Sequence, residues 1–134
     1  MKVVVDTSVW SLAFRRREAV PEPAVEALRK LIREGLVVML GAVRQEVLSG
    51  IRHREQFDRL RDLLSAFPDL EVTTEDYEMA AELCNRCLGQ GVQAAHTDFL
   101  IAAVAINRMW TVLSTDKDFQ HIARIVPVQL VELH

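Results

Sequence analysis

Short runs rich in apolar residues alternate along this chain with longer segments of helical periodicity. The first run, Val3-Val4-Val5, is apolar at every position, which is typical of a strand buried on both faces. Further runs predict strands at residues 36–40, 70–72, 111–114 and 128–133. A strand–helix–strand order of this kind indicates a mainly parallel sheet covered by helices on both faces. We therefore expect the α/β class and a three-layer α/β/α sandwich.

The segments between these runs carry start and stop signals of helices. The step Pro21-Glu22-Pro23 predicts a helix start, because proline suits the first helical turn, and Gly35 predicts the end of that helix. Thr73-Thr74 with Asp76 predicts a capped helix start. Other helices are predicted at residues 43–48, 97–106 and 118–125. A further amphipathic helix that ends at Pro68 is predicted from its apolar stripe, Phe57, Leu60, Leu63, Leu64 and Phe67.

The size and composition of the chain restrict its class. With 134 residues it has the usual size of one domain, so we expect a single domain over residues 1–134. Its formal net charge of −3 argues against a protein that coats DNA. Two cysteines are too few for a disulfide scaffold. The longest apolar run is far short of the roughly 20 residues that span a membrane, and no signal peptide is recognisable, so we expect a cytoplasmic protein.

Four acidic residues lie where the expected fold would gather them. In an open parallel sheet, ligands bind beyond the carboxyl ends of the strands. Asp6 and Asp116 follow two predicted strands, and Glu46 lies in the helix after the second strand. Asp98 lies in the first turn of the apolar helix. Taken singly, each acid has a structural explanation as a helix cap, a partner of a helix dipole or a surface charge.

Taken together, these carboxylates predict a metal site. Three or four carboxylates at one edge of a sheet repel each other strongly unless a cation or protons neutralise them. Mg²⁺ and Mn²⁺ prefer oxygen ligands of this type and keep water in their remaining positions. Such a site can activate a water molecule and bind a phosphate oxygen.

Each of these acids lies within a longer stretch that resembles a known motif. The stretches are Val4-Val5-Asp6-Thr7-Ser8-Val9-Trp10, Val43-Arg44-Gln45-Glu46-Val47-Leu48-Ser49-Gly50, His96-Thr97-Asp98-Phe99-Leu100-Ile101-Ala102-Ala103 and Leu113-Ser114-Thr115-Asp116-Lys117-Asp118-Phe119. In this order and spacing they resemble the four motifs of the PIN-domain family, and within it the VapC toxins of toxin–antitoxin pairs. The resemblance covers essentially the whole chain. One departure is His96-Thr97, which stands where many relatives have other residues before the third acid.

The resemblance implies a PIN-like fold and a Mg²⁺- or Mn²⁺-dependent endoribonuclease. Such an enzyme hydrolyses RNA, here tRNA or another structured RNA, with a metal-activated water, and leaves a 5′-phosphate and a 3′-hydroxyl. By the same resemblance, Asp6, Glu46, Asp98 and Asp116 form the catalytic and metal-binding pocket. Asp6 and Asp98 are then the direct metal ligands, whereas Glu46 and Asp116 bind a second metal ion or position water.

Three neighbouring residues belong to the same implied site. Asp118 is a further candidate ligand, and the choice between Asp116 and Asp118 stays open. Thr115 and Ser8 are expected to donate hydrogen bonds that orient carboxylates or phosphate.

Basic residues near the first two motifs are candidate contacts for RNA. Without the four pocket acids the formal net charge would change from −3 to +1, so a polyanion need not be repelled. We hypothesise that the run Arg15-Arg16-Arg17, together with Arg44, contacts RNA phosphates. A solvated loop explains such a run equally well. The resemblance also implies a homodimer and a cognate VapB-like antitoxin whose tail blocks the acidic pocket. Trp10 is expected in the core or at an interface, or else, with Leu12 and Phe14, exposed where the antitoxin docks.

Other classes of function remain as alternatives. A receiver-like phosphoacceptor signalling domain needs adjacent acids after the first strand and an aspartate at the end of a middle strand, but Asp6 precedes Thr7-Ser8 and the strand 36–40 ends at Gly41. A phosphatase of the haloacid dehalogenase type needs a second acid at position 8, which is serine. The third alternative is a non-catalytic PIN-like module for RNA binding or assembly, against which the presence of all four acids argues.

Overall fold

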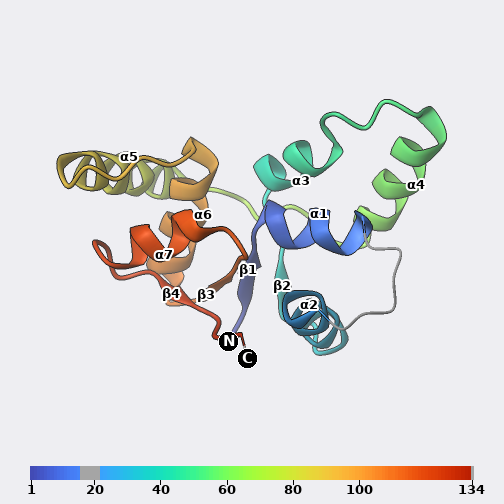
Figure 1. Cartoon of the computed structure of the whole chain (residues 1–134), viewed down its shortest axis with the longest axis horizontal. Helices are drawn as coiled ribbons and strands as arrows, with labels where there is room; N and C mark the ends of the chain where they lie inside the picture. The colour runs from blue at the N-terminus through green and yellow to red at the C-terminus, as the bar shows by residue number, and fades with distance from the viewer. Residues whose placement is uncertain (16–21, 134) are drawn as a thin grey trace.

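The computed structural model describes residues 1–15 and 22–133. Its elements in chain order are β1 (Val3–Val5), α1 (Thr7–Arg15), α2 (Pro23–Arg33), β2 (Val37–Val38), α3 (Gly41–Leu48), α4 (Arg54–Leu64), α5 (Thr74–Gly89), α6 (His96–Arg108), β3 (Thr111–Leu113), α7 (Lys117–Ala123) and β4 (Gln129–Leu130). Figure 1 shows α5, α6 and α7 gathered on one side of the sheet and α1 to α4 on the other. The predicted three-layer α/β/α sandwich is thus confirmed.

The strands of the described sheet all run parallel, in the order β2-β1-β3-β4. Strand β1 lies inside the sheet, where Val3 pairs with Val37 of β2 on one side and with Thr111 of β3 on the other. All three of its valines are buried, because helices cover both faces of the sheet. Since β1 and β3 are parallel neighbours, their carboxyl ends meet at the same edge.

Helix α1 was not expected from the sequence. Thr7, Ser8, Val9 and Trp10 are weak helix formers, and three of them are β-branched or aromatic. The helix is stabilised by packing instead, because Val9 and Trp10 are buried and α1 contacts both α2 and α3. Its first turn begins directly after β1, where the amide of Val9 donates to the carbonyl of Asp6 at 3.1 Å.

Two other predictions need correction. Residues 70–72 do not form a strand, because only Asp69 is bridged to Met39 and a single further bond joins the Leu70 amide to the Met39 carbonyl. The stripe of the amphipathic helix is also shorter than predicted. Helix α4 ends at Leu64, so Phe67 lies beyond it, and Leu63 is 53% exposed.

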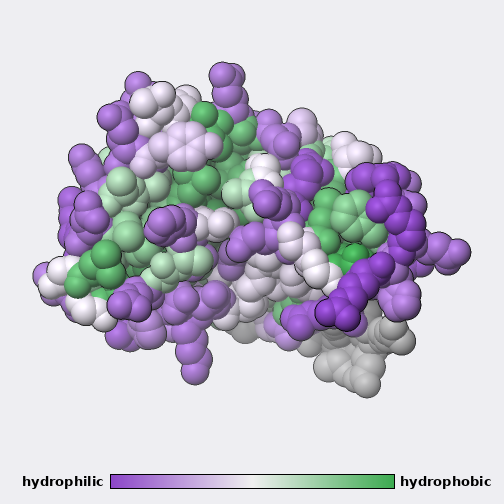
Figure 2. Space-filling view, turned by 90° about the horizontal axis from the view of Figure 1, so that it is seen from above, coloured by the Kyte–Doolittle hydropathy of each residue, from purple (hydrophilic) through white to green (hydrophobic). Residues whose placement is uncertain are grey.

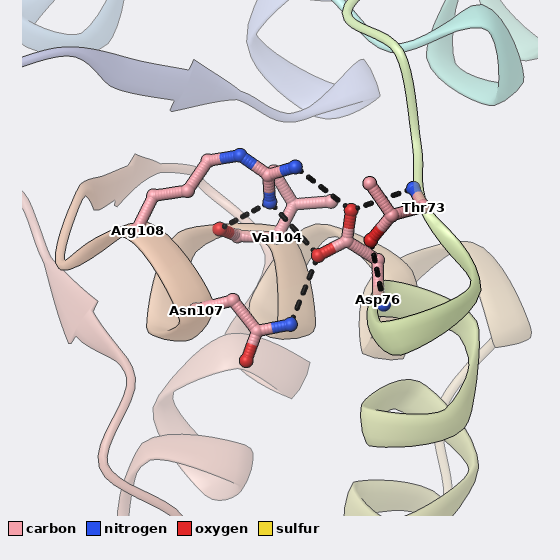
Figure 3. A network of polar contacts seen from close by, with 5 residues as sticks. All are labelled: Thr73, Asp76, Val104, Asn107 and Arg108. Carbon is pink, nitrogen blue, oxygen red and sulfur yellow. Dashed lines mark hydrogen bonds and ion pairs between the residues drawn. The ribbon is translucent and has the colours of Figure 1, made fainter.

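A buried ion pair joins the start of α5 to the end of α6, as Figure 3 shows. Both terminal nitrogens of Arg108 donate to the carboxylate of Asp76, at 2.8 and 2.9 Å. Asn107 and the Thr73 amide donate to the same carboxylate, each at 2.9 Å, so that four hydrogen bonds satisfy a side chain that is only 1% exposed. The Arg108 guanidinium holds the pKa of Asp76 well below its usual range.

This pair fixes the long helical hairpin that carries one candidate site residue. Helix α6 is the most buried helix of this layer, with all residues from 101 to 105 fully buried, and Asp98 lies at its opposite end. None of the helices in the described ranges is long and apolar enough to cross a membrane.

Candidate metal centre

Asp6 is the first residue after β1 and lies at the carboxyl edge of the sheet. Its side chain is only 3% exposed, and its amide donates to the Leu113 carbonyl of the neighbouring strand at 2.9 Å. Two serine hydroxyls donate to the same oxygen, Oδ2: Ser8 at 2.7 Å and Ser114 at 2.8 Å. In the described part of the chain no hydrogen bond reaches Oδ1, which leaves that oxygen available to a ligand.

The turn after β3 is held to Asp6 through those hydroxyls. The Thr115 amide donates to Ser8 Oγ at 3.1 Å, and the Asp116 amide donates to Ser114 Oγ at 2.9 Å. Asp116 then caps α7, since its Oδ1 accepts the Asp118 amide at 2.9 Å. The turn is therefore fixed at both ends, and its two acids face the same edge as Asp6.

Asp98, in the first turn of α6, meets these two acids within the same helical layer. Carboxylate oxygens of Asp98, Asp116 and Asp118 all lie within 4.8 Å of one another. Asp98 is the third residue of α6, and one of its oxygens accepts the Ala95 amide at 3.3 Å, so the start of the helix orients it. Asp98 is 7% exposed, whereas Asp116 is exposed and Asp118 half-buried.

The electrostatics of the site show that it is overcharged without a cation. Burial and the negative charges of Asp6, Asp116 and Asp118 raise the pKa of Asp98 to about 7, against an ordinary value of 3.8. The only opposing influence in the described residues is the Ala95 amide, which lowers this pKa. Near neutral pH Asp98 is therefore partly protonated, whereas an ordinary carboxyl would be fully ionised.

Glu46 lies on α3, next to the same edge but outside the cluster of three. Thr7, at the start of α1, donates from Oγ1 to Glu46 Oε1 at 2.8 Å. This bond links the first motif to the second across 39 residues of sequence. Glu46 is exposed, so its second oxygen is accessible to solvent.

This donor set fits a hard divalent cation. All of its candidate ligands are carboxylate oxygens, which Mg²⁺ and Mn²⁺ prefer over nitrogen or sulfur. The spacing of the three clustered acids permits ligation of one ion by oxygens from α6, from the N-cap of α7 and from the first turn of α7. The raised pKa of Asp98 is the response expected of carboxylates arranged for a cation. Asp6 and Glu46 extend the same edge, each with one oxygen already hydrogen-bonded.

The predicted basic residues lie in different situations. Arg44 is engaged in hydrogen bonds within the chain. It donates to Asp69 Oδ1 at 2.9 Å, to the Leu64 carbonyl at 3.0 Å and to the Phe67 carbonyl. It thereby fixes the segment that follows α4. Arg15 is exposed at the end of α1. Arg16 and Arg17 lie outside the described residues.

Two hydroxyl residues of the site were not identified from the sequence. Thr7 and Ser114 flank residues that were, and each contacts a carboxylate of the site. Their roles depend on contacts between segments 39 and 108 residues apart, which a single sequence does not display. The signal available was the hydroxyl-rich character of both motifs, Asp6-Thr7-Ser8 and Ser114-Thr115-Asp116.

Comparison with known proteins gives consistent matches over nearly the whole chain. A family model described as PIN domain matches residues 3–125. The chain is 33% identical over 131 residues to VapC ribonuclease Mb1587 of Mycobacterium bovis, and the match covers 95% of this chain and 96% of that protein. The same figures hold for ribonuclease VapC11 of Mycobacterium tuberculosis. The fold is also similar to a chain of VapBC2 from Rickettsia felis, solved bound to a DNA fragment from their promoter, with a TM-score of 0.78, 20% identity and 98% of each chain covered.

Proposed function

The chain belongs to the PIN domain family, and from that premise we propose that it is a divalent-metal-dependent endoribonuclease acting as the toxin of a toxin–antitoxin pair. The observation that carries this proposal is the convergence of acids from separate motifs on one edge of the sheet. Asp98 meets Asp116 and Asp118 within 4.8 Å, and Asp6 contributes to the raised pKa of Asp98. Relatives that share a third of the sequence over nearly their whole length are named ribonucleases.

The proposed chemistry assigns the acids to metal binding. Asp6 and Asp98 would hold the Mg²⁺ or Mn²⁺ ion, with Asp116 or Asp118 completing the site and Glu46 holding a second ion or a water molecule. When bound, the ion supplies an activated water and neutralises charge on the scissile phosphate. Because a metal ligand must be deprotonated, Asp98 would hold the ion in its ionised form.

Other groups of the chain would position these acids and the substrate. Ser8 and Ser114 orient Asp6, and Thr7 orients Glu46. Thr115 is exposed on the same turn, where its hydroxyl can donate to a phosphate oxygen. Hydrolysis in this arrangement would leave a 5′-phosphate and a 3′-hydroxyl.

RNA is the proposed substrate, either tRNA or another structured RNA. Figure 2 looks onto the carboxyl edge of the sheet and shows strongly hydrophilic side chains along the end of the molecule that carries α4. Three arginines of this helix, Arg54, Arg59 and Arg61, are exposed. Together with Arg15, and with Arg16 and Arg17 as sequence-based candidates, they are proposed to contact RNA phosphates.

A VapB-like antitoxin is the proposed protein partner, and a homodimer the proposed assembly. The expected docking region includes a groove of about 300 Å³ between α1, α3 and α4. Phe14, Val47, Ile51 and Leu60 give it an apolar lining, and Arg15 lies beside them. Trp10 is buried in the core at 2% exposure, the first of the two positions expected for it, so the aromatic side chain of the groove is Phe14.

Cleavage of purified RNA tests the proposal. Purified protein is incubated with total tRNA, ribosomal RNA and messenger RNA in Mg²⁺ or Mn²⁺, with EDTA, Asp98→Asn and Glu78→Gln in parallel. Glu78 is the control, because it is an exposed acid on α5, away from both the cluster and the arginines of α4. We expect discrete fragments from the unchanged protein and from Glu78→Gln, and none with EDTA or Asp98→Asn. Cleavage that survives Asp98→Asn, or no cleavage of any of the three RNAs, would contradict the proposal.

A further inference from the structure

Three hydroxyls hold two carboxylate oxygens at the edge of the sheet, one of Asp6 and one of Glu46. Ser8 and Ser114 both donate to Asp6 Oδ2, at 2.7 and 2.8 Å, and Thr7 donates to Glu46 Oε1 at 2.8 Å. In both acids the bonded oxygen is therefore distinct from the oxygen left for another partner. Within the described residues, no hydrogen bond is directed at Asp6 Oδ1 or Glu46 Oε2.

The carboxylates and the backbone amides together fix the direction of the serine hydrogen bonds. An ionised carboxylate only accepts, so each hydroxyl must donate to it. Behind Ser8 and Ser114, the amides of Thr115 and Asp116 donate to the same hydroxyl oxygens, at 3.1 and 2.9 Å. Each serine thus accepts from a backbone N–H and donates to Asp6. Because both serines meet one oxygen of a side chain that is 3% exposed, Asp6 has little freedom to rotate.

Coordination chemistry gives this arrangement a consequence. Ca²⁺ takes six to eight oxygens and often binds a carboxylate through both of its oxygens. Mg²⁺ requires an octahedral set, keeps several waters and is satisfied by one oxygen from each of one or two carboxylates. A carboxylate whose second oxygen is held by hydroxyls is therefore a good ligand for Mg²⁺ or Mn²⁺ and a poor one for Ca²⁺.

We propose that Thr7, Ser8 and Ser114 are specificity-determining residues for the metal ion: by holding one oxygen of Asp6 and one of Glu46, they restrict both acids to single-oxygen ligation and so select Mg²⁺ or Mn²⁺ against Ca²⁺. This inference rests on the proposed function, since it assumes that the acidic site binds a divalent ion. It adds the ion discrimination and assigns it to residues that bind no ion themselves.

Ion affinities measured without RNA test the inference. Dissociation constants for Mg²⁺ and Ca²⁺ are obtained by competition against Mn²⁺, whose free fraction is followed by electron paramagnetic resonance. The variants are Ser8→Ala/Ser114→Ala, which removes both donors to Asp6 Oδ2, and Thr7→Val, which removes the donor to Glu46 at nearly constant volume. Ser114→Thr keeps both hydroxyls at Asp6 and should keep the ion preference. Ser65→Ala is the matched control, because the hydroxyl of Ser65, the residue after α4, donates among the described residues only to the Asp62 carbonyl.

We expect the preference for Mg²⁺ over Ca²⁺ to fall in Ser8→Ala/Ser114→Ala, by up to about the tenfold by which a lost hydrogen bond to a metal ligand changes metal affinity. Thr7→Val tests the Glu46 half separately, should the double variant fail to fold. An unchanged ratio of the two affinities in the folded variants would overturn the inference, even if both ions bind more weakly, because a merely structural role weakens both alike. If the unchanged protein binds no divalent ion, both the proposed function and this inference are wrong. The titration of the unchanged protein therefore separates that outcome from a failure of the inference alone.

Discussion

The raised pKa of Asp98 predicts an unusual dependence of stability on pH in the metal-free protein. A carboxyl whose pKa is about 7 when folded and 3.8 when unfolded binds more protons in the folded state between these values. The free energy of unfolding therefore falls as pH rises through this window, and the loss is complete above pH 7. Because Asp98 is only 7% exposed, solvent screens little of this effect.

The magnitude follows from the difference between the two pKa values. Each pKa unit corresponds to about 1.4 kcal/mol. The raised pKa of Asp98 therefore lowers the free energy of unfolding by about 4 kcal/mol at pH 8 and by about 1.5 kcal/mol at pH 5. Asp98→Asn removes the titrating group. Its stability relative to the unchanged protein should therefore increase by about 2 to 3 kcal/mol between pH 5 and pH 8.

Urea unfolding in EDTA at both pH values measures this change. The constant cost of replacing the carboxylate with an amide cancels, because only the difference between the two pH values is compared. Asp62→Asn serves as the control and should show no such change. Adding Mn²⁺ at pH 8 should stabilise the unchanged protein and not Asp98→Asn. If the relative stability of Asp98→Asn is the same at pH 5 and pH 8, the electrostatic account of the site is wrong.

Three further predictions concern the scaffold. Arg108→Met leaves Asp76 buried and unpaired, so we expect a loss of about 3–5 kcal/mol in urea unfolding, and a smaller loss in Asp76→Asn/Arg108→Met; equal losses would show that the buried charge is not the cause. Because the pKa of Asp76 is lowered, the stabilisation from this pair should be lost as pH falls below about 4, and a pH-independent effect of Asp76→Asn would contradict this. Met109 has a φ of 58° and is 81% exposed, so Met109→Gly should raise the free energy of unfolding by about 1 kcal/mol; a lower thermal midpoint would refute the strain.

Much of the fold was predictable because local signals and burial agree. The all-apolar Val3–Val5 run reads as a strand between two helical layers, and the capping box of Thr73 and Asp76 marks the start of α5. Helix α1 was missed because its residues have low helix propensity and packing alone stabilises it. The prediction of a strand at residues 70–72 was wrong, because an apolar pattern predicts burial and does not show whether a neighbouring strand is available for pairing.

For the site, the sequence predicts the location of the acids but not their orientation. The sequence predicts that acids gather at the carboxyl edge of the sheet, and the structure brings Asp98, Asp116 and Asp118 together there. It did not predict how the carboxylates are oriented. That information lies in hydrogen bonds such as the one from Ser114 to Asp6, which joins residues 108 positions apart.

This last separation has a consequence for how the protein is made. The oxygen of Asp6 is fixed only when β3 has paired with β1 and the turn after it is in place, which requires residues up to about position 118. A translation product that stops earlier contains Asp6 and Glu46 but neither Ser114 nor the acids of the last motif. For an enzyme proposed to act as a toxin, we therefore expect a chain that stops before this turn to lack a complete acidic site.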